Sequence, residues 1–205
     1  NDTTYTKTLG FHLGDDDIGD FFDFSIKQDP KWGMPVFALN AGVSSCPNEP
    51  NTVPRDGVEL TSDTYTIVDI MPGDVGTFTL NLGNISDIGE DRYYDIRYIP
   101  TDENQGVIVN YQGSPFTLME DVFVEAGGSI SRTFSISRDP VLDVYDFENI
   151  SIMAYPECEY ELEQEYAPSA FHHEDLIDTL FINAAFVAPC SEVSIYGLPD
   201  DWILN

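Results

Sequence analysis

The sequence has very few positive charges. Its 205 residues include 8 lysines and arginines against 37 aspartates and glutamates, which gives a formal net charge of −29 at pH 7. Nucleic acids and anionic membrane surfaces repel a chain of this charge, so the composition argues against both as partners. Most of the carboxylates cannot find a basic partner within the chain. We expect them to face water or a metal ion, or to lie in a salty medium that screens their repulsion.

Long hydrophobic runs are also absent. No apolar run approaches the roughly 18–20 residues that a membrane helix needs, so we expect no membrane insertion. The sequence shows no signal peptide and opens with Asn1, which fits a fragment or a processed mature chain. A hydrophobic content of 42% with 13% aromatics still predicts a packed, globular protein.

Cysteine is scarce, with Cys46, Cys158 and Cys190 as the complete set. Three cysteines allow one disulfide and one odd thiol, in three pairings. Each lies in loop-like sequence near the end of a predicted strand, which suits a disulfide in an oxidising compartment better than a catalytic thiol. We favour a Cys158–Cys190 pairing across the acidic segment between them, with Cys46 as the competitor for either partner. The expected location is therefore extracellular or on a cell surface.

Catalytic motifs are missing as well. The sequence contains no phosphate-binding loop, dinucleotide fingerprint, Gly-x-Ser-x-Gly elbow or basic stripe. The adjacent His172 and His173 would point to opposite sides of a strand, and they lack the spacing of zinc ligands. With 37 acidic residues, two carboxylates at a glycosidase separation would arise by chance. We therefore predict that the protein is not an enzyme, and a hydrolase is the weakest of the alternatives.

The pattern that is present has a period of two residues. Phe78, Leu80 and Leu82 alternate with polar residues, as do Phe134 and Ile136, and glycine, proline and asparagine cluster between such runs. Short alternating strands with dense turns predict an all-β, antiparallel β-sandwich. The predicted core consists of Phe22, Phe24, Ile26, Val36, Phe37, Phe78, Leu80, Leu82, Ile96, Phe134, Ile136, Ile152, Leu180, Ile182 and Phe186.

The chain divides into four predicted parts. Residues 62–158 are expected to form an immunoglobulin-like sandwich. The N-terminal strands in 1–61 are expected to pack with 176–205, which also holds an exit segment ending in "DDWILN". Residues 159–175 read as an acidic loop excursion between two strands.

Three segments carry a resemblance to known modules. "PGDVGTFTLNLGNIS" (72–86) resembles the opening of immunoglobulin-like adhesion modules. "FHLGDDDIGDFFDFSIKQDPKWGMPVFALNAGVSSCP" (11–47) and "FVAPCSEVSIYGLPDDWILN" (186–205) are similar to modules of very large secreted surface proteins, chiefly of the Bacteroidota. The resemblance implies an extracellular, repeated, structural or adhesive architecture. Neighbouring copies or modules of the same surface protein would then be the partners. It supplies no catalytic residues.

The stretch "GDDDIGD" (14–20) is the best candidate for a metal site. Hard cations take six to eight oxygen ligands, and carboxylates spaced one or two residues apart in a glycine-containing loop can surround one. Asp15, Asp17 and Asp20 have this spacing. We therefore predict a structural calcium ion bound by these three residues, and the alternative is a solvated turn between two strands.

Aromatic residues raise a second functional hypothesis. Trp32, Tyr93 and Tyr94 could stack on sugar rings, as in carbohydrate-binding sandwiches, or they could simply pack in the core and at strand edges. The favoured function is a non-enzymatic, extracellular structural or adhesive module, a subunit or repeat of a secreted surface or filament protein. The alternative is a carbohydrate-binding module of a secreted protein, for which glycans would be the partners.

Overall fold

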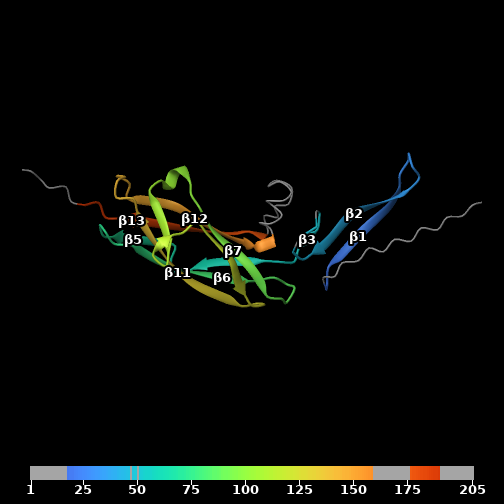
Figure 1. Ribbon diagram of the computed structural model, residues 1–205, viewed down its shortest axis with the longest axis horizontal. Coiled ribbons are helices and arrows are strands. Elements are labelled where there is room, and N and C mark those ends of the chain that lie inside the picture. The colour runs from blue at the N-terminus through green and yellow to red at the C-terminus, as the bar shows by residue number, and fades with distance from the viewer. Residues whose placement is uncertain (1–17, 47, 50, 159–175, 190–205) are drawn as a thin grey trace, which may run out of the picture.

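The computed structural model describes residues 18–46, 48–49, 51–158 and 176–189. These residues form thirteen strands in three sheets. The one helix that both begins and ends within the described residues is the short 3-10 helix η1 (Asp102–Asn104). Two five-stranded sheets face each other at one end of an elongated molecule, and a three-stranded sheet lies at the other end (Figure 1). The prediction of an all-β, antiparallel sandwich of immunoglobulin-like type is confirmed.

The first sheet of the sandwich has the strand order β10-β7-β12-β13-β5. Its neighbours are antiparallel except for β13 and β5, which run parallel. The strands are β10 (Leu118–Val124), β7 (Arg92–Ile99), β12 (Asp146–Pro156), β13 (Asp178–Phe186) and β5 (Thr66–Ile70).

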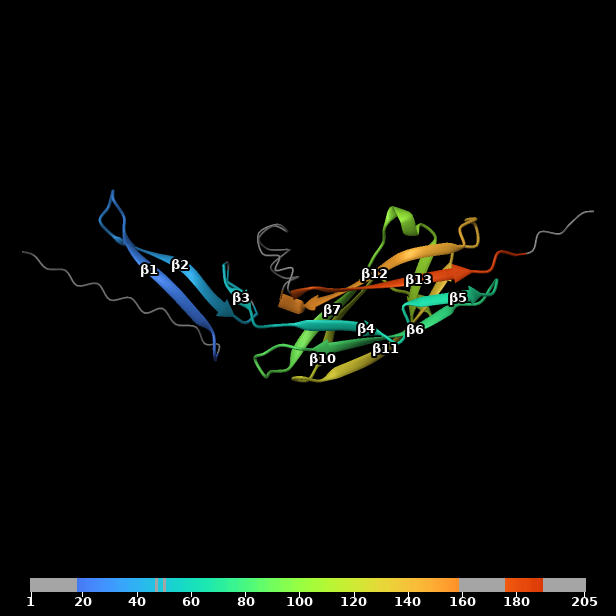
Figure 2. The same cartoon turned by 180° about the vertical axis from the view of Figure 1, so that it is seen from behind.

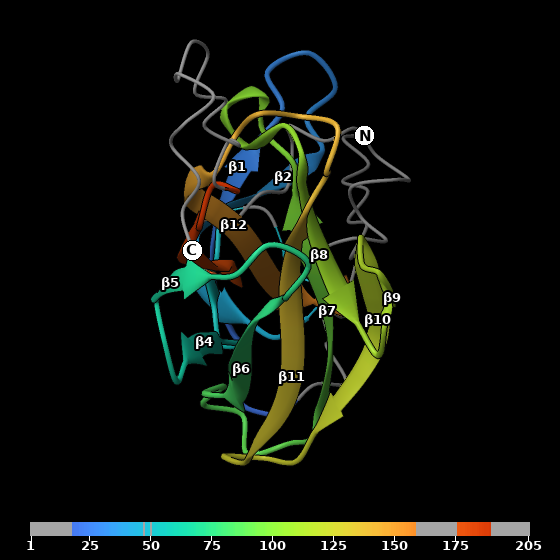
Figure 3. The same ribbon diagram turned by 90° about the vertical axis from the view of Figure 1, so that its left-hand side faces the viewer.

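The second sheet has the order β4-β6-β11-β8-β9 and is antiparallel throughout. Its strands are β4 (Val58–Ser62), β6 (Gly76–Asn84), β11 (Ser129–Arg138), β8 (Val107–Tyr111) and β9 (Ser114–Pro115). Figure 3 shows this sheet from the end of the sandwich that lies away from β1 and β2.

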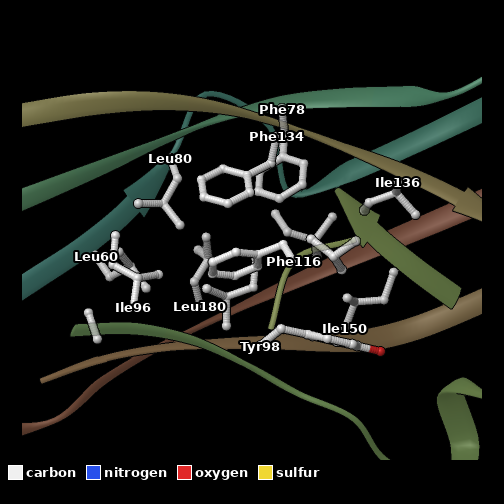
Figure 4. Close-up of a cluster of buried hydrophobic side chains, with 14 of the residues drawn as sticks. Leu60, Phe78, Leu80, Ile96, Tyr98, Phe116, Phe134, Ile136, Ile150 and Leu180 are labelled. Carbon is white, nitrogen blue, oxygen red and sulfur yellow. The ribbon is translucent and has the colours of Figure 1, made fainter. Parts of the chain in front are cut away.

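The hydrophobic core lies between the two sheets (Figure 4). Along β6 the side chains of Phe78, Leu80 and Leu82 are buried, and the residues between them are more exposed, as the alternation predicts. Phe134 is at the centre of an aromatic cluster, because its ring lies 5.6 Å from that of Phe78 and 5.0 Å from that of Phe116. The core residues predicted between positions 78 and 186 are all buried.

The third sheet is built on a hairpin that projects from the sandwich (Figures 1 and 2). Strand β1 (Phe21–Gln28) pairs antiparallel with β2 (Pro35–Ser44), and the short β3 (Val53–Pro54) runs parallel to β2. In the part of the chain that the structure describes, no second sheet packs against this hairpin.

The predicted core is therefore wrong for the hairpin. Phe24, Ile26 and Val36 are 37%, 70% and 46% exposed, and Phe22 and Phe37 are only partly buried. Alternation identifies the apolar face of a strand but does not supply a surface for that face to pack on.

The predicted domain boundaries also need correction. Strand β13 does not pair with the hairpin strands of the N-terminal part, because it lies between β12 and β5 and buries Leu180 and Ile182 in the sandwich core. It meets residues 1–61 at β4, where the N–H of Leu60 donates to Oδ2 of Asp178 at 2.7 Å. Strand β4, which we placed with the N-terminal part, pairs with β6. The sandwich therefore comprises 58–156 together with 178–186. The predicted excursion 159–175 lies outside the described residues.

We expect Phe134→Ala to lower the free energy of unfolding by about 3–5 kcal/mol, because it leaves a cavity in the aromatic cluster. Ile26→Ala, at an exposed position of the hairpin, should cost less than about 0.5 kcal/mol. Urea denaturation of both variants measures the difference. An equally large loss of unfolding free energy for Ile26→Ala would contradict the exposure of this face of the hairpin, because it would show that another surface covers Ile26.

Candidate functional site

The hairpin sheet and the sandwich are joined by a disulfide between Cys46 and Cys158. Cys46 follows the end of β2, and Cys158 follows the end of β12. The two Cα atoms are 6.0 Å apart and the residues are 112 positions apart in sequence. The bond therefore links two separate sheets that lie far apart along the chain.

This pairing corrects the predicted Cys158–Cys190 disulfide. Strand β13 is antiparallel to β12, so that Asp178 lies opposite Ala154 near Cys158, whereas Ala185 lies opposite Asp146 at the other end of β12. The strand thus carries the chain away from Cys158 before Cys190 is reached. Cys190 itself lies outside the described residues.

A buried ion pair lies directly beside the disulfide. Asp56 belongs to the linker between β3 and β4, and its side chain is fully buried. Its Oδ1 accepts a hydrogen bond from Nε of Arg92 at 2.6 Å, and its Oδ2 accepts one from the backbone N–H of Cys46 at 2.6 Å. One carboxylate thus binds both the strand of the sandwich that begins at Arg92 and the residue that forms the disulfide.

The preceding linker residue, Arg55, makes a second ion pair. Its Nη1 lies 3.0 Å from Oδ1 of Asp20, just before β1, and its Nε lies 3.1 Å from Oδ1 of Asp87 in the sandwich. Asp20 also accepts hydrogen bonds from the backbone N–H and the hydroxyl of Ser45, at 2.8 and 2.9 Å. Arg55 therefore bridges the two parts in the same way as Asp56.

The charges of this junction stabilise one another. Burial alone would raise the pKa of Asp20, but the hydrogen bonds from Ser45 and Arg55 outweigh it and lower that pKa below 3.8. Burial alone would lower the pKa of Arg92, but Asp56 and Glu90 outweigh it and raise that pKa. Both side chains are therefore held in their charged forms at neutral pH.

Backbone and tyrosine contacts complete the junction. The N–H of Arg55 donates to the carbonyl of Ser44 at 2.9 Å, and the N–H of Asp87 donates to the carbonyl of Arg55 at 3.0 Å. The hydroxyl of Tyr94 donates to the carbonyl of Gly57 at 2.9 Å, and burial raises the pKa of Tyr94 to about 12. Every residue of the linker 55–57 is thereby tied to the sandwich.

A cavity of 310 Å³ opens beside the disulfide. Its charged lining includes Arg92, whose guanidinium is already paired with Asp56 and Glu90. The complete lining is Cys46, Asp91, Arg92, Tyr93, Pro156, Glu157 and Cys158. Because these carboxylates hold the Arg92 guanidinium in place, we assign Arg92 a structural role in the wall of the cavity and not a ligand-binding one.

The predicted metal site is described only in part. Asp15 and Asp17 lie outside the described residues, and Asp20 is paired with Arg55. Within the described residues, no group of three or more His, Cys, Asp or Glu is placed to hold a metal ion. Calcium binding therefore stays a prediction.

The three predicted sugar-stacking aromatics do not lie together. Trp32 is 66% exposed in the turn between β1 and β2. Tyr93 is exposed on β7, where its ring lies 5.3 Å from that of Phe123. Tyr94 is fully buried and cannot stack on a ligand. Of the three predicted residues, only Trp32 and Tyr93 reach the surface, and they lie on different sheets, so the three form no common platform.

Sequence reasoning missed the junction residues Ser45, Arg55, Asp56 and Arg92. The scarcity of positive charge was the available signal. A chain with 8 basic and 37 acidic residues has few cations that could offset the charge of a buried carboxylate. Two of those eight cations lie at this junction.

Comparison with known proteins gives similarity in structure alone. No family model and no curated protein sequence matches the chain. It resembles a FixG-related protein from Vibrio parahaemolyticus, at 14% identity and a TM-score of 0.37 over 65% of this chain and 98% of that one. It also resembles the ASH/PapD-like domain 7 of human CEP192, at 14% identity and a TM-score of 0.39 over 71% and 94%. A CARDB domain from Pyrococcus furiosus matches at 13% identity and a TM-score of 0.32 over 65% and 94%. Likenesses at this level assign no function.

The lowered pKa of Asp20 predicts a pH dependence. A carboxylate with a depressed pKa in the folded state stabilises the fold above its ordinary pKa, and this contribution is lost as the pH falls through the depressed value. Asp20→Asn should therefore cost about 1–2 kcal/mol at pH 7, and the cost should shrink as the pH falls below 3.8. Urea denaturation at a series of pH values measures it.

Asp23→Asn, on the exposed face of the same hairpin, is the matched control and should leave stability nearly unchanged at pH 7. A cost of Asp20→Asn that stays constant down to about pH 3 would contradict the assignment of this carboxylate to the ion pair.

Proposed function

We propose that this chain is a non-enzymatic, extracellular structural module, a subunit or repeat of a secreted surface or filament protein. Its task is to hold a projecting hairpin in a fixed position at the end of a β-sandwich. The observation that carries the proposal is the junction, where the Cys46–Cys158 disulfide and the ion pairs of Arg55 and Asp56 all join the same two parts.

The disulfide supports a location outside the cytosol, because such bonds persist in oxidising compartments and are rare where thiols are kept reduced. Within the described residues, no helix is long and apolar enough to cross a membrane. The large negative charge suits a surface that must stay soluble at high local concentration.

The placement of the charged groups supports a structural role. Buried ion pairs cost desolvation energy, and they are useful where they fix one geometry against others. Asp56 and Arg92 form such a pair, and their remaining hydrogen-bonding groups are taken up by Cys46 and Glu90. A chemistry that used these side chains would have to break the contacts that hold the hairpin in place.

Carbohydrate binding is the alternative, and Trp32 carries it. The separation of Trp32 from Tyr93, and the burial of Tyr94, remove the extended stacking platform on which it was based. A glycan array probed with the wild-type chain and with Trp32→Ala tests it directly.

The proposal includes a structural calcium ion bound by carboxylates of residues 14–20. A bound calcium ion would offset the repulsion among four closely spaced carboxylates, and that repulsion is the supporting observation. If the ion binds the folded state, the melting temperature should rise with calcium and fall with chelator. Asp15→Asn combined with Asp17→Asn should abolish that response while leaving the Asp20–Arg55 pair intact. A wild-type melting curve that chelator does not move would contradict a bound calcium ion.

The rigid junction is tested by small-angle X-ray scattering. In dilute solution the wild-type chain should scatter as a single elongated particle, and Cys46→Ser combined with Cys158→Ser should broaden its distribution of dimensions. Cys190→Ser is the matched control, because it removes a cysteine without touching the junction disulfide, and it should scatter like the wild type. Identical scattering from the double variant and the wild type would contradict a structural role for the disulfide.

A further inference from the structure

The turn between β1 and β2 is held in one conformation by hydrogen bonds among its own residues. The N–H of Asp29 donates to the carbonyl of Met34, and the N–H of Gly33 donates to the carbonyl of Asp29, each at 2.8 Å. Oδ1 of Asp29 accepts hydrogen bonds from the N–H groups of Lys31 and Trp32, both at 2.7 Å. Gly33 has φ +66°, a conformation that favours glycine. The turn, Asp29–Met34, is thus pre-organised, and we call it the tip.

The tip exposes large apolar side chains. Trp32 is 66% exposed and Met34 is 58% exposed, and Nζ of Lys31 lies 4.8 Å from the centre of the Trp32 ring. A tryptophan held on a pre-organised loop binds a partner at a low cost in conformational entropy. Tryptophan is also among the residues that most often dominate binding interfaces. The tip therefore has the properties of a docking anchor.

The tip also carries positive charge on a strongly acidic chain. Lys27 and Lys31 are two of the 8 basic residues and both lie at this end of the hairpin, where Asp29 is the one carboxylate between them, so that the local charge is +1. Arg55 and Arg92 are paired with carboxylates at the junction instead. A partner with a local acidic surface is favoured for this end of the hairpin. Two copies of net charge −29 repel one another overall, so a second copy can dock only where salt screens that repulsion and an acidic surface faces the lysines directly.

The far end of the sandwich offers a hollow that complements the tip. It has a volume of 370 Å³, within the range of about 300–1,000 Å³ typical of binding pockets. The side chains of Asp146 and Glu148 are exposed there, and Phe147 between them is buried. The lining residues are Thr66, Asp146, Phe147, Glu148, Asn183, Ala184 and Ala185, which include no lysine or arginine.

None of the residues that line the hollow is a lysine or arginine that could neutralise Asp146 and Glu148. Arg138, which precedes β12, has its guanidinium 4.3 Å from the Tyr145 ring and donates to the carbonyls of Asp139 and Leu142. It is not among the residues that line the hollow. The hollow lies where β12 begins and β13 ends, at the opposite end of the molecule from the tip (Figures 1 and 2).

We propose that the tip of one copy docks into the hollow of the next, with Trp32 in the hollow and Lys31 facing Asp146 and Glu148. Because the two surfaces lie at opposite ends of an elongated molecule, the contact is head-to-tail and builds an open array rather than a closed dimer. This inference rests on the proposed function and names its partner as a second copy of the chain. A contact limited to one turn and one hollow buries little surface and is therefore weak. Association should then appear only at high concentration.

Sedimentation velocity over a concentration series, at about 0.15 M salt, tests the proposal. The mean mass of the wild-type chain should rise continuously with concentration. A tip variant, Lys31→Glu with Trp32→Ala, should stay monomeric, and so should a hollow variant, Asp146→Lys with Glu148→Lys. An equimolar mixture of the two variants retains one intact tip and one intact hollow, so it should form dimers and nothing larger.

The matched control is Glu59→Lys with Glu120→Lys, which makes the same change of charge at exposed positions on β4 and β10 and should associate like the wild type. Wild-type chains that stay monomeric at every concentration would overturn the proposal, as would a mixture that stays monomeric while the wild type associates. Glycan binding that depends on Trp32 in a monomeric chain would overturn it in favour of the carbohydrate alternative. Scattering from the monomeric hollow variant still tests the rigid junction, so that failure of docking is distinguishable from failure of the proposed function.

Discussion

The buried carboxylate of Asp56 is the group on which the arrangement of the two parts depends. It lies in the short linker between the hairpin sheet and the sandwich, and it binds the N–H of Cys46 on one side and Arg92 on the other. An unpaired buried charge is strongly destabilising, so these contacts must form together. Their formation places Cys46 beside Cys158, and the disulfide then removes conformational freedom from a loop of 112 residues, worth about 4–5 kcal/mol in the chain-entropy model.

The consequence for the molecule is an elongated shape with two different ends. The hairpin gains little from packing, since Phe24, Ile26 and Trp32 remain exposed along it, and its position is fixed at its base. The disulfide and the ion pairs at the base of the hairpin hold it in position, so that its surface can extend away from the hydrophobic core. The tip can be rigid and the hairpin exposed because the hydrophobic core of the sandwich supplies the stability elsewhere.

Much of the fold could be predicted from the sequence. Period-2 alternation located β6, β11 and β13 and most of the core, because a strand with one buried face must alternate. The same pattern misled us for Phe24 and Ile26, since it reports an apolar face whether or not another sheet covers it. The partner of Cys158 could not be predicted either, because it depends on the direction of β13 within the sheet. The junction was hidden for a similar reason, as Asp20, Arg55 and Asp87 meet only once three separate segments fold together.

The central claim is that Cys46 and Cys158 join the hairpin sheet to the sandwich. Proteolysis of the folded chain without reduction, after free thiols have been blocked, followed by mass spectrometry of the peptides, tests it most directly. The structure predicts a cross-linked pair of peptides that contain Cys46 and Cys158, and this pair should separate on reduction. A Cys158–Cys190 pair, or three blocked thiols, would contradict the account of the junction.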